Sequence, residues 1–168
     1  MNIRPISDAD AERVLEIYQI GIETGHATFE LAAPDWDAFK DKFVAEPRLG
    51  IDVDGRLAGW AMLSGVSSRC VYEGVAEISI YMHPDYGRQG LGTRLLDALV
   101  QASEGAGYWT LQAGIFPENI ASLKLHAACG FRQMGVREKV AKMGHGEMAG
   151  DWRDVIMLER RSTVVGID

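Results

Sequence analysis

Cysteine and histidine are scarce in this sequence, and neither residue type forms a metal-binding pattern. The two cysteines, Cys70 and Cys129, stand far apart, and the four histidines are scattered along the chain. Zinc sites draw such ligands from short, regular spacings. We therefore expect no metal ion, and we expect two free thiols in a reducing, cytoplasmic setting.

Long apolar runs, a signal-peptide pattern and an excess of basic charge are also lacking. No stretch approaches the ~20 apolar residues of a membrane-spanning helix, and the first ten residues are polar and acidic rather than basic and then apolar. The net charge of −7 argues against binding to nucleic acid, which needs a basic face. We expect neither a membrane nor a nucleic acid as a partner.

The composition that remains is typical of one globular domain spanning residues 1–168. Hydrophobic residues make up 47% of the chain and charged residues 24%, enough for a full core without a bias towards disorder. Apolar periodicity and turn signals predict an α/β domain with a mixed sheet. Strands are expected at 2–6, 51–53, 57–63, 75–82, 109–115, 131–138 and 155–158, and helices at 7–25, 35–45, 93–106 and 119–128.

A glycine-rich loop, residues 87–93, follows the predicted strand 75–82 and opens a predicted helix. Strand, glycine loop and helix together present backbone N–H groups and a helix dipole to an anion. The loop lacks the Gly-Lys-Ser/Thr ending of a P-loop, and its glycine spacing differs from that of a dinucleotide fingerprint. It predicts either an anion site or a plain tight turn into a helix.

Several further motifs occur in order along nearly the whole chain. They are Ile3-Arg4-Pro5, Ile17-Tyr18, Thr28-Phe29-Glu30, Gly59-Trp60-Ala61, Arg69-Cys70-Val71-Tyr72, the run 77–84 (EISIYMHP), Ala113-Gly114-Ile115, the run 118–122 (ENIAS), Leu125-His126 and Gly130-Phe131. With the glycine loop, this series resembles the GNAT N-acetyltransferase superfamily, and within it the phosphinothricin and methionine-sulfoximine acetyltransferases. The resemblance implies a single domain whose mostly antiparallel sheet is splayed between two central parallel strands and flanked by about four helices. It also implies acetyl-CoA as co-substrate, a small-molecule amine as acceptor and a homodimer.

The resemblance further assigns a set of acetyl-CoA-binding residues. The pantetheine arm would lie against one strand segment and the start of one helix, and the pyrophosphate would lie on the glycine loop. These residues are Ser79, Ile80, Tyr81, Met82, Gly87, Arg88, Gln89, Gly90, Leu91, Gly92, Thr93, Asn119 and Ser122. Gly87 stands where the superfamily usually has Gln or Arg, so backbone amides and Arg88 would carry the contact. Residues 79–82 are equally consistent with a core strand, and Asn119 with a simple helix N-cap.

Two residues are implied to act in catalysis. Glu77 matches a carboxylate that deprotonates the amine, and His126 matches the branch at the position that protonates the departing thiolate. A backbone N–H near Ile80 or Tyr81 would face the thioester oxygen. The alternatives without a catalytic role are that Glu77 is a solvent-facing strand residue and that His126 is a structural helix residue.

Phe29, Glu30, Arg69 and Tyr72 are implied, with Glu77, to form the acceptor pocket, with Arg69 pairing with a carboxylate. We therefore expect acetyl transfer to the α-amine of a small amino acid or analogue, such as phosphinothricin, methionine sulfoximine or methionine sulfone. The segment 142–150 is longer than in this branch and would alter the preference if it reaches the pocket. The alternatives are an acetyltransferase for a protein N-terminus, a polyamine or an aminoglycoside, and a non-catalytic acyl-CoA-binding module.

Overall fold

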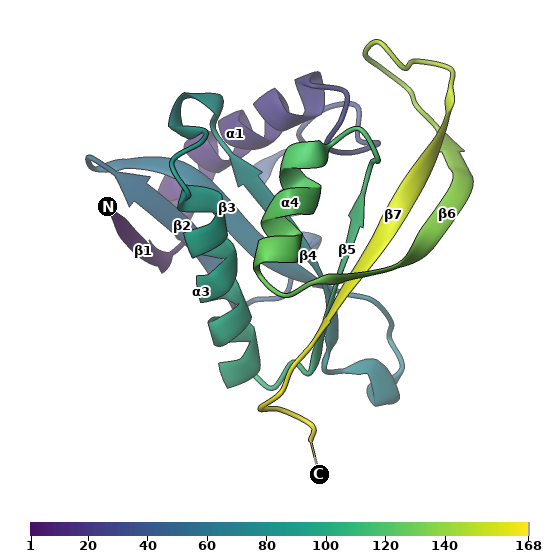
Figure 1. Ribbon diagram of the computed structural model, residues 1–168. Helices are drawn as coiled ribbons and strands as arrows, with labels where there is room; N and C mark the ends of the chain where they lie inside the picture. The colour runs from purple at the N-terminus through teal and green to yellow at the C-terminus, as the bar shows by residue number, and fades with distance from the viewer. Residues whose placement is uncertain (168) are drawn as a thin grey trace.

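One seven-stranded sheet runs through residues 1–167, the part of the chain that the computed structural model describes (Figure 1). Its strand order is β1-β2-β3-β4-β5-β7-β6. The strands are β1 (Asn2–Pro5), β2 (Arg48–Val53), β3 (Arg56–Gly65), β4 (Val75–Met82), β5 (Thr110–Ile115), β6 (Arg132–Lys142) and β7 (Trp152–Arg161). The α-helices are α1 (Ala11–Glu23), α2 (Trp36–Asp41), α3 (Leu91–Gly105) and α4 (Ile120–Ala128), and 3-10 turns form η1 (Asp8–Asp10), η2 (Cys70–Tyr72) and η3 (Pro84–Tyr86).

The centre of the sheet holds a parallel pair whose strands part. β4 and β5 are paired in parallel over three positions, ending at Glu77 opposite Gln112, although β4 continues to Met82 and β5 to Ile115. The other neighbouring strands among residues 1–167 run antiparallel. This confirms the predicted α/β fold, with its mixed sheet splayed between two central parallel strands.

Helices cover the two faces of the sheet unequally. α3 and α4 lie together on one face, and α1 lies on the other (Figure 1). The α3 face holds the larger core, which includes Leu95, Leu99 and Leu111, and the α1 face holds a second core built around Trp60 and Phe39. The hairpin of β6 and β7 extends past both layers at one edge of the sheet.

Local signals explain why these elements form where they do. The apolar residues Val14, Ile17, Tyr18 and Ile22 recur at helical spacing in α1, and all four are buried. Between β2 and β3, Asp54 (φ 50°) and Gly55 (φ 79°) both adopt the left-handed conformation that a tight two-residue hairpin requires.

α2 ends at Asp41, four residues before the predicted end. The chain leaves the helix because the Val44 N–H donates to the carbonyl of Leu63 at 2.9 Å, which ties it to β3. The Arg48 guanidinium then donates to the carbonyls of Lys40, Phe43 and Val44. Tertiary hydrogen bonds thus replace the last helical turn.

β6 and β7 are longer than predicted, because this hairpin continues past the core. Most β6 side chains are exposed, so apolar alternation is weak there. A bulge interrupts the pairing between Arg137 and Ala141, where Lys139 has φ 47° and its N–H donates to Asp154 at 2.8 Å. The loop between these strands spans residues 143–151, one residue later than the expected segment 142–150.

Residues 143–151 pack against the end of α1 rather than projecting freely. Met143 is buried, and the His145 ring bonds through Nε2 to the carbonyl of Ile22 at 2.9 Å. A Cβ on Gly144 would lie 2.6 Å from Leu31. Within residues 1–167, no helix combines the length and apolar character needed to cross a membrane.

Candidate active site

A cavity of about 1150 Å³ opens where β4 and β5 part. Its walls come from the end of α1, the loop 24–30, the loop before α3 and the start of α4, and residues of β6 and β7 line it as well. A space of this size is large for one small ligand. It can hold an extended cofactor together with an acceptor.

The predicted cofactor residues converge on this cavity from three segments. The strand residues Ser79, Ile80, Tyr81 and Met82 line it, and so do Asn119 and Ser122. From the glycine loop, Gly87, Arg88, Gly90, Leu91, Gly92 and Thr93 line it as well, whereas Gln89 does not.

The glycine loop turns sharply into α3 at its cavity side. Gly90 is the N-cap of α3 and has φ 71°, a conformation that costs little for glycine alone. The first N–H groups of α3 lack acceptors within the helix and carry the positive end of its dipole. A Cβ on Gly92 would lie 2.5 Å from Leu125, so this glycine also lets α4 approach the loop closely.

The edge of β4 beyond Glu77 has no β5 partner. From Ile78 to Met82, β4 pairs only with β3, so backbone groups on its other side face the cavity. The Tyr81 ring stacks on Trp60 at 4.8 Å and so packs into the α1-side core. An extended ligand can therefore add to this edge through main-chain hydrogen bonds, as an added strand does.

Glu77 lies at the point where the two parallel strands begin to part. Its side chain lines the cavity and is exposed to the solvent there. Partial desolvation raises the pKa of its carboxyl above the ordinary value of 4.5, and the positive charge of Arg137 opposes part of that rise. The carboxylate is thus a stronger base than a free glutamate.

His126 projects from α4 into the cavity wall and is 2% exposed. Its Nδ1 lies 2.8 Å from the carbonyl oxygen of Ser122, which can only accept, so Nδ1 carries a proton. Burial lowers the pKa of the imidazole below its ordinary 6.5, and the bond to Ser122 opposes part of that fall. At neutral pH the ring is therefore neutral, with Nε2 free to accept a proton.

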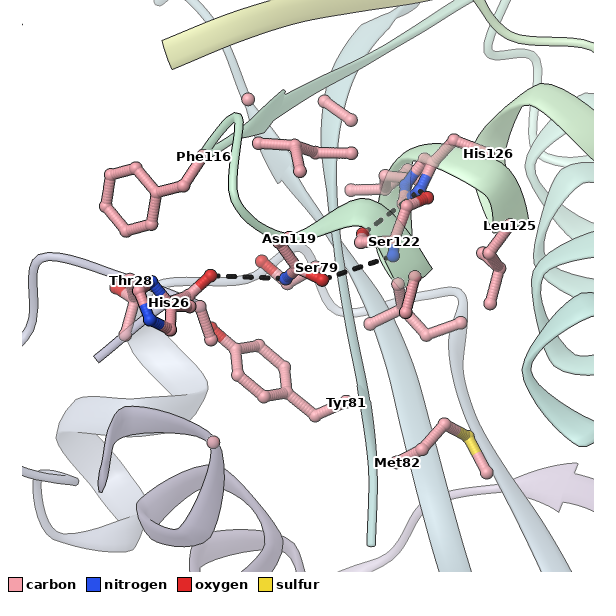
Figure 2. A pocket seen from close by; sticks show the side chains of 18 of the residues that line it. His26, Thr28, Ser79, Tyr81, Met82, Phe116, Asn119, Ser122, Leu125 and His126 are labelled. Atoms are coloured by element: carbon pink, nitrogen blue, oxygen red, sulfur yellow. Dashed lines mark hydrogen bonds between the residues drawn. The ribbon is translucent and has the colours of Figure 1, made fainter. Parts of the chain in front are cut away.

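Asn119 joins the cofactor end of the cavity to the loop after α1. Its Oδ1 accepts from the Ser122 N–H and caps α4, while its Nδ2 donates to the carbonyl of His26, both at 3.2 Å. Figure 2 shows this chain of contacts, with His26 and Thr28 on one side and the α4 residues Ser122 and His126 on the other. The N-cap role is confirmed, and the same side chain positions the facing loop.

Three of the five residues predicted to bind the acceptor line the cavity: Glu77 and the loop residues Phe29 and Glu30. The Phe29 ring meets Phe116 edge-on at 4.8 Å, and Glu30 forms an ion pair with Lys42 at 2.7 Å. Arg69 and Tyr72 do not line it. They lie at η2, where the Arg69 guanidinium covers the Tyr72 ring at 5.5 Å.

The profile of the family described as "Acetyltransferase (GNAT) family" matches residues 11–131. The chain belongs to the GNAT acetyltransferase family. A phosphinothricin N-acetyltransferase of Alcaligenes faecalis is 34% identical over 164 residues, covering 94% of this chain and 81% of the relative. An L-methionine sulfoximine/L-methionine sulfone acetyltransferase of Salmonella typhimurium is 28% identical over 164 residues, covering 95% of this chain and 93% of the relative.

A solved structure agrees with the sequence comparison. The GNAT phosphinothricin acetyltransferase of Sinorhizobium meliloti in complex with AcCoA superposes with a TM-score of 0.86 at 26% identity, covering 99% of this chain and 91% of that one. The resemblance to phosphinothricin and methionine-sulfoximine acetyltransferases is thus confirmed at modest identity over the full length.

Sequence reasoning missed one buried cation that organises this GNAT site. Arg153 on β7 is 1% exposed, and it donates to the Gly25 carbonyl at 3.0 Å, to His26 Nδ1 at 3.3 Å and to Glu118 at 2.9 Å. Its guanidinium also lies 4.0 Å from the Phe116 ring centroid. Arg153 therefore clamps the loop after α1 to the loop before α4.

Other cavity residues of this GNAT domain carried no sequence signal. His26, Arg137 and Met157 line the cavity from outside the motifs that the sequence analysis identified. Within residues 1–167, no group of three His, Cys, Asp or Glu side chains is placed to hold a metal ion. The loop 143–151 does not line the cavity but packs on the loop after α1, which does.

Proposed function

We propose that this GNAT protein transfers an acetyl group from acetyl-CoA to the primary α-amine of a small amino acid or amino-acid analogue. The observation that carries the proposal is the position of Glu77. It stands where β4 and β5 part, between the free edge of β4 and the acceptor end of the same cavity. A base at that point can reach an amine that attacks an acyl group lying along β4.

The residues present fit acetyl-CoA. The N–H groups of residues 88–93 and the α3 dipole suit the pyrophosphate, and the free edge of β4 from Ile78 to Met82 suits the pantetheine amides. When bound, acetyl-CoA supplies an acyl carbon activated as a thioester. Arg88 lies beside the same loop, so Gly87 in place of Gln or Arg removes a side chain but none of these backbone donors.

Two side chains manage the two protons that the acceptor's ammonium group must lose. Glu77 accepts the first, directly or through water, because a protonated amine has no lone pair for attack, and later releases it to solvent. As the new C–N bond forms and the C–S bond breaks, a backbone N–H near Ile80 or Tyr81 stabilises charge on the acyl oxygen. His126, neutral with a free Nε2, takes the second proton from the newly bonded nitrogen and passes it to the departing sulfur, so both side chains regain their starting protonation states at the end of each turnover.

The names of the relatives support an amino-acid acceptor. Both curated relatives described above act on amino-acid analogues, as their names state. At its acceptor end the cavity is lined by side chains of the loop 24–30, β6 and β7, which can contact a small acceptor directly. A homodimer and a cytoplasmic location stay predictions from the resemblance, and sedimentation velocity tests the first.

Mass spectrometry of purified protein with acetyl-CoA and an amine panel tests the proposal. The panel holds methionine sulfone, phosphinothricin, the common amino acids, a polyamine, an aminoglycoside and a short peptide. We expect N-acetylated amino acids and free CoA in equal amounts. Faster acetylation of the peptide, polyamine or aminoglycoside would favour another amine class, and no turnover with tight acetyl-CoA binding would favour a non-catalytic module.

A further inference from the structure

One basic side chain at the acceptor end of the cavity has no role in the scheme above. Arg137 lies on β6 and pairs in register with Val155 of β7. Side chains opposite one another in an antiparallel pair project on the same face of the sheet. Both residues line the cavity, on the face that also carries Glu77 and Met157.

Arg137 and Glu77 line the same cavity from strands that are separated by β5 and β7. Arg137 keeps an exposed side chain on β6, and its positive charge lowers the pKa of the Glu77 carboxyl, although desolvation of that carboxyl has the larger, opposite effect. The cavity therefore carries one carboxylate and one guanidinium on this face of the sheet.

Arg137 also lacks the carboxylate partner that three other arginines of this hairpin have, and the fifth, Arg161, donates to backbone carbonyls instead. Arg132, Arg153 and Arg160 form ion pairs with Glu159, Glu118 and Glu104 at 2.7–2.9 Å. Among residues 1–167, no carboxylate lies within ion-pair distance of Arg137. Of the other cations at the cavity, Lys42 is paired with Glu30, and Arg88 belongs to the glycine loop.

We propose that Arg137 binds the α-carboxylate of the acceptor while Glu77 faces its α-amine, an inference that rests on the proposed function. A guanidinium presents two parallel N–H donors to a carboxylate, which fixes orientation as well as charge. In this chain, Arg137 therefore takes the carboxylate-binding role that the resemblance implied for Arg69. Polyamines, aminoglycosides and the N-termini of peptides lack an α-carboxylate next to the reacting amine, so Arg137 makes the site selective for free amino acids.

A matched pair of acceptors tests this role. L-methionine sulfone and 3-(methylsulfonyl)propylamine differ only in the carboxylate. Arg137→Gln should raise the KM for methionine sulfone about 10- to 100-fold, the range for a hydrogen bond to a charged group, and leave the KM for the plain amine and for acetyl-CoA unchanged. Arg137→Lys, which keeps the charge but not the two-pronged geometry, should fall in between.

Arg132→Gln is the control, because it removes an exposed arginine from the same strand outside the cavity. It should change neither KM. Equal loss on both acceptors in Arg137→Gln, or no loss on either, overturns the role of Arg137 but leaves the amino-acid acetyltransferase standing. If wild-type protein acetylates only the plain amine, the proposed acceptor class and Arg137 both fall. If nothing is acetylated, calorimetric titration of methionine sulfone in the presence of CoA still tests the role of Arg137. Equal binding by the wild type and Arg137→Gln would contradict that role.

Discussion

The two halves of the cavity are built from different parts of the chain. The half proposed to bind the cofactor is lined by two stretches, residues 77–93 and 119–126, and offers mainly backbone groups. The acceptor half takes side chains from the loop after α1, from β6 and from β7. Backbone donors persist through side-chain changes, whereas a side-chain pocket changes with each substitution. This difference explains how a family can keep one co-substrate while its acceptors vary.

Glu77 stands at the border of the two halves, and its loss should have the largest effect. Glu77→Gln keeps the shape but removes the base, so we expect kcat/KM for the amine to fall about 10²- to 10³-fold at pH 7. The dissociation constant for acetyl-CoA should stay the same. Steady-state rates with methionine sulfone and calorimetry with acetyl-CoA measure the two effects.

The control for Glu77→Gln is Glu73→Gln, an exposed glutamate outside the cavity. It should retain full activity. A Glu77→Gln enzyme within a few fold of wild type would contradict the assignment of the base.

Loss of the Arg153 clamp should damage the acceptor half alone. Arg153→Leu removes the donors to Gly25, His26 and Glu118, so the loop after α1 loses its fixed position. We expect the KM for the amino acid to rise about 10- to 100-fold and the free energy of unfolding to fall by about 1–3 kcal/mol, from the lost hydrogen bonds. Kinetics and urea denaturation measure these changes.

Arg160→Leu provides the comparison for the clamp. It breaks an ion pair on the same strand, but with Glu104, away from the cavity. Its effect should be confined to stability. A similar rise in KM for Arg160→Leu would show that general destabilisation, not the clamp, disturbs the acceptor.

The cofactor half should respond to backbone geometry instead. Gly90→Ala places a Cβ at φ 71°, where the left-handed conformation costs about 1–2 kcal/mol, so acetyl-CoA should bind about tenfold more weakly. Nothing lies within 4 Å of that Cβ, so sterics with neighbouring groups add little. Calorimetry with acetyl-CoA measures the change, and an unchanged affinity would show that the loop does not bind the pyrophosphate in this conformation.

Arg88→Gln should have the smallest effect of the four changes. If backbone amides hold the pyrophosphate, an exposed side chain adds only about 0–1 kcal/mol, or less than about fivefold in the dissociation constant for acetyl-CoA. The same titration at two salt concentrations tests it. If Arg88→Gln weakened acetyl-CoA binding more than Gly90→Ala does, the Arg88 side chain would contribute more to binding than the backbone of the loop, which would contradict this account.

The sequence was most informative where local rules decide the structure. The amphipathic α1, the Asp54-Gly55 turn, the β4–loop–α3 unit and the Asn119 cap all depend on neighbours along the chain, and each was predicted close to its observed place. The early end of α2 was not predictable, because the Val44 N–H bonds to Leu63 on β3 and the Arg48 guanidinium binds the carbonyls at the end of the helix. The exposed strand β6 likewise shows no hydrophobic alternation in the sequence.

The same contrast separates the two halves of the site. The cofactor residues follow from motifs, and all but Gln89 line the cavity. The acceptor residues depend on which distant strands meet, so Arg69 and Tyr72 were placed by resemblance and lie elsewhere in the single chain, while Arg137 and Arg153 escaped notice. Arg153 reads as an ordinary strand residue until the fold buries it beneath Phe116 and His26.

The most direct test is the pH dependence of kcat/KM for wild type and Glu77→Gln. Glu77 must be ionised to accept a proton, so its contribution is present above its pKa, which burial raises from 4.5, and is lost as pH falls through that value. His126 must be neutral, so its contribution also disappears on acidification, below 6.5. Wild type should therefore reach a plateau near neutral pH, while Glu77→Gln should follow the free-amine fraction and keep rising until the pH reaches the pKa of the acceptor's amine. The ratio of the two rates should shrink steadily as pH increases. Parallel profiles with a constant ratio would contradict the account, because they would show that Glu77 does not remove the proton from the amine.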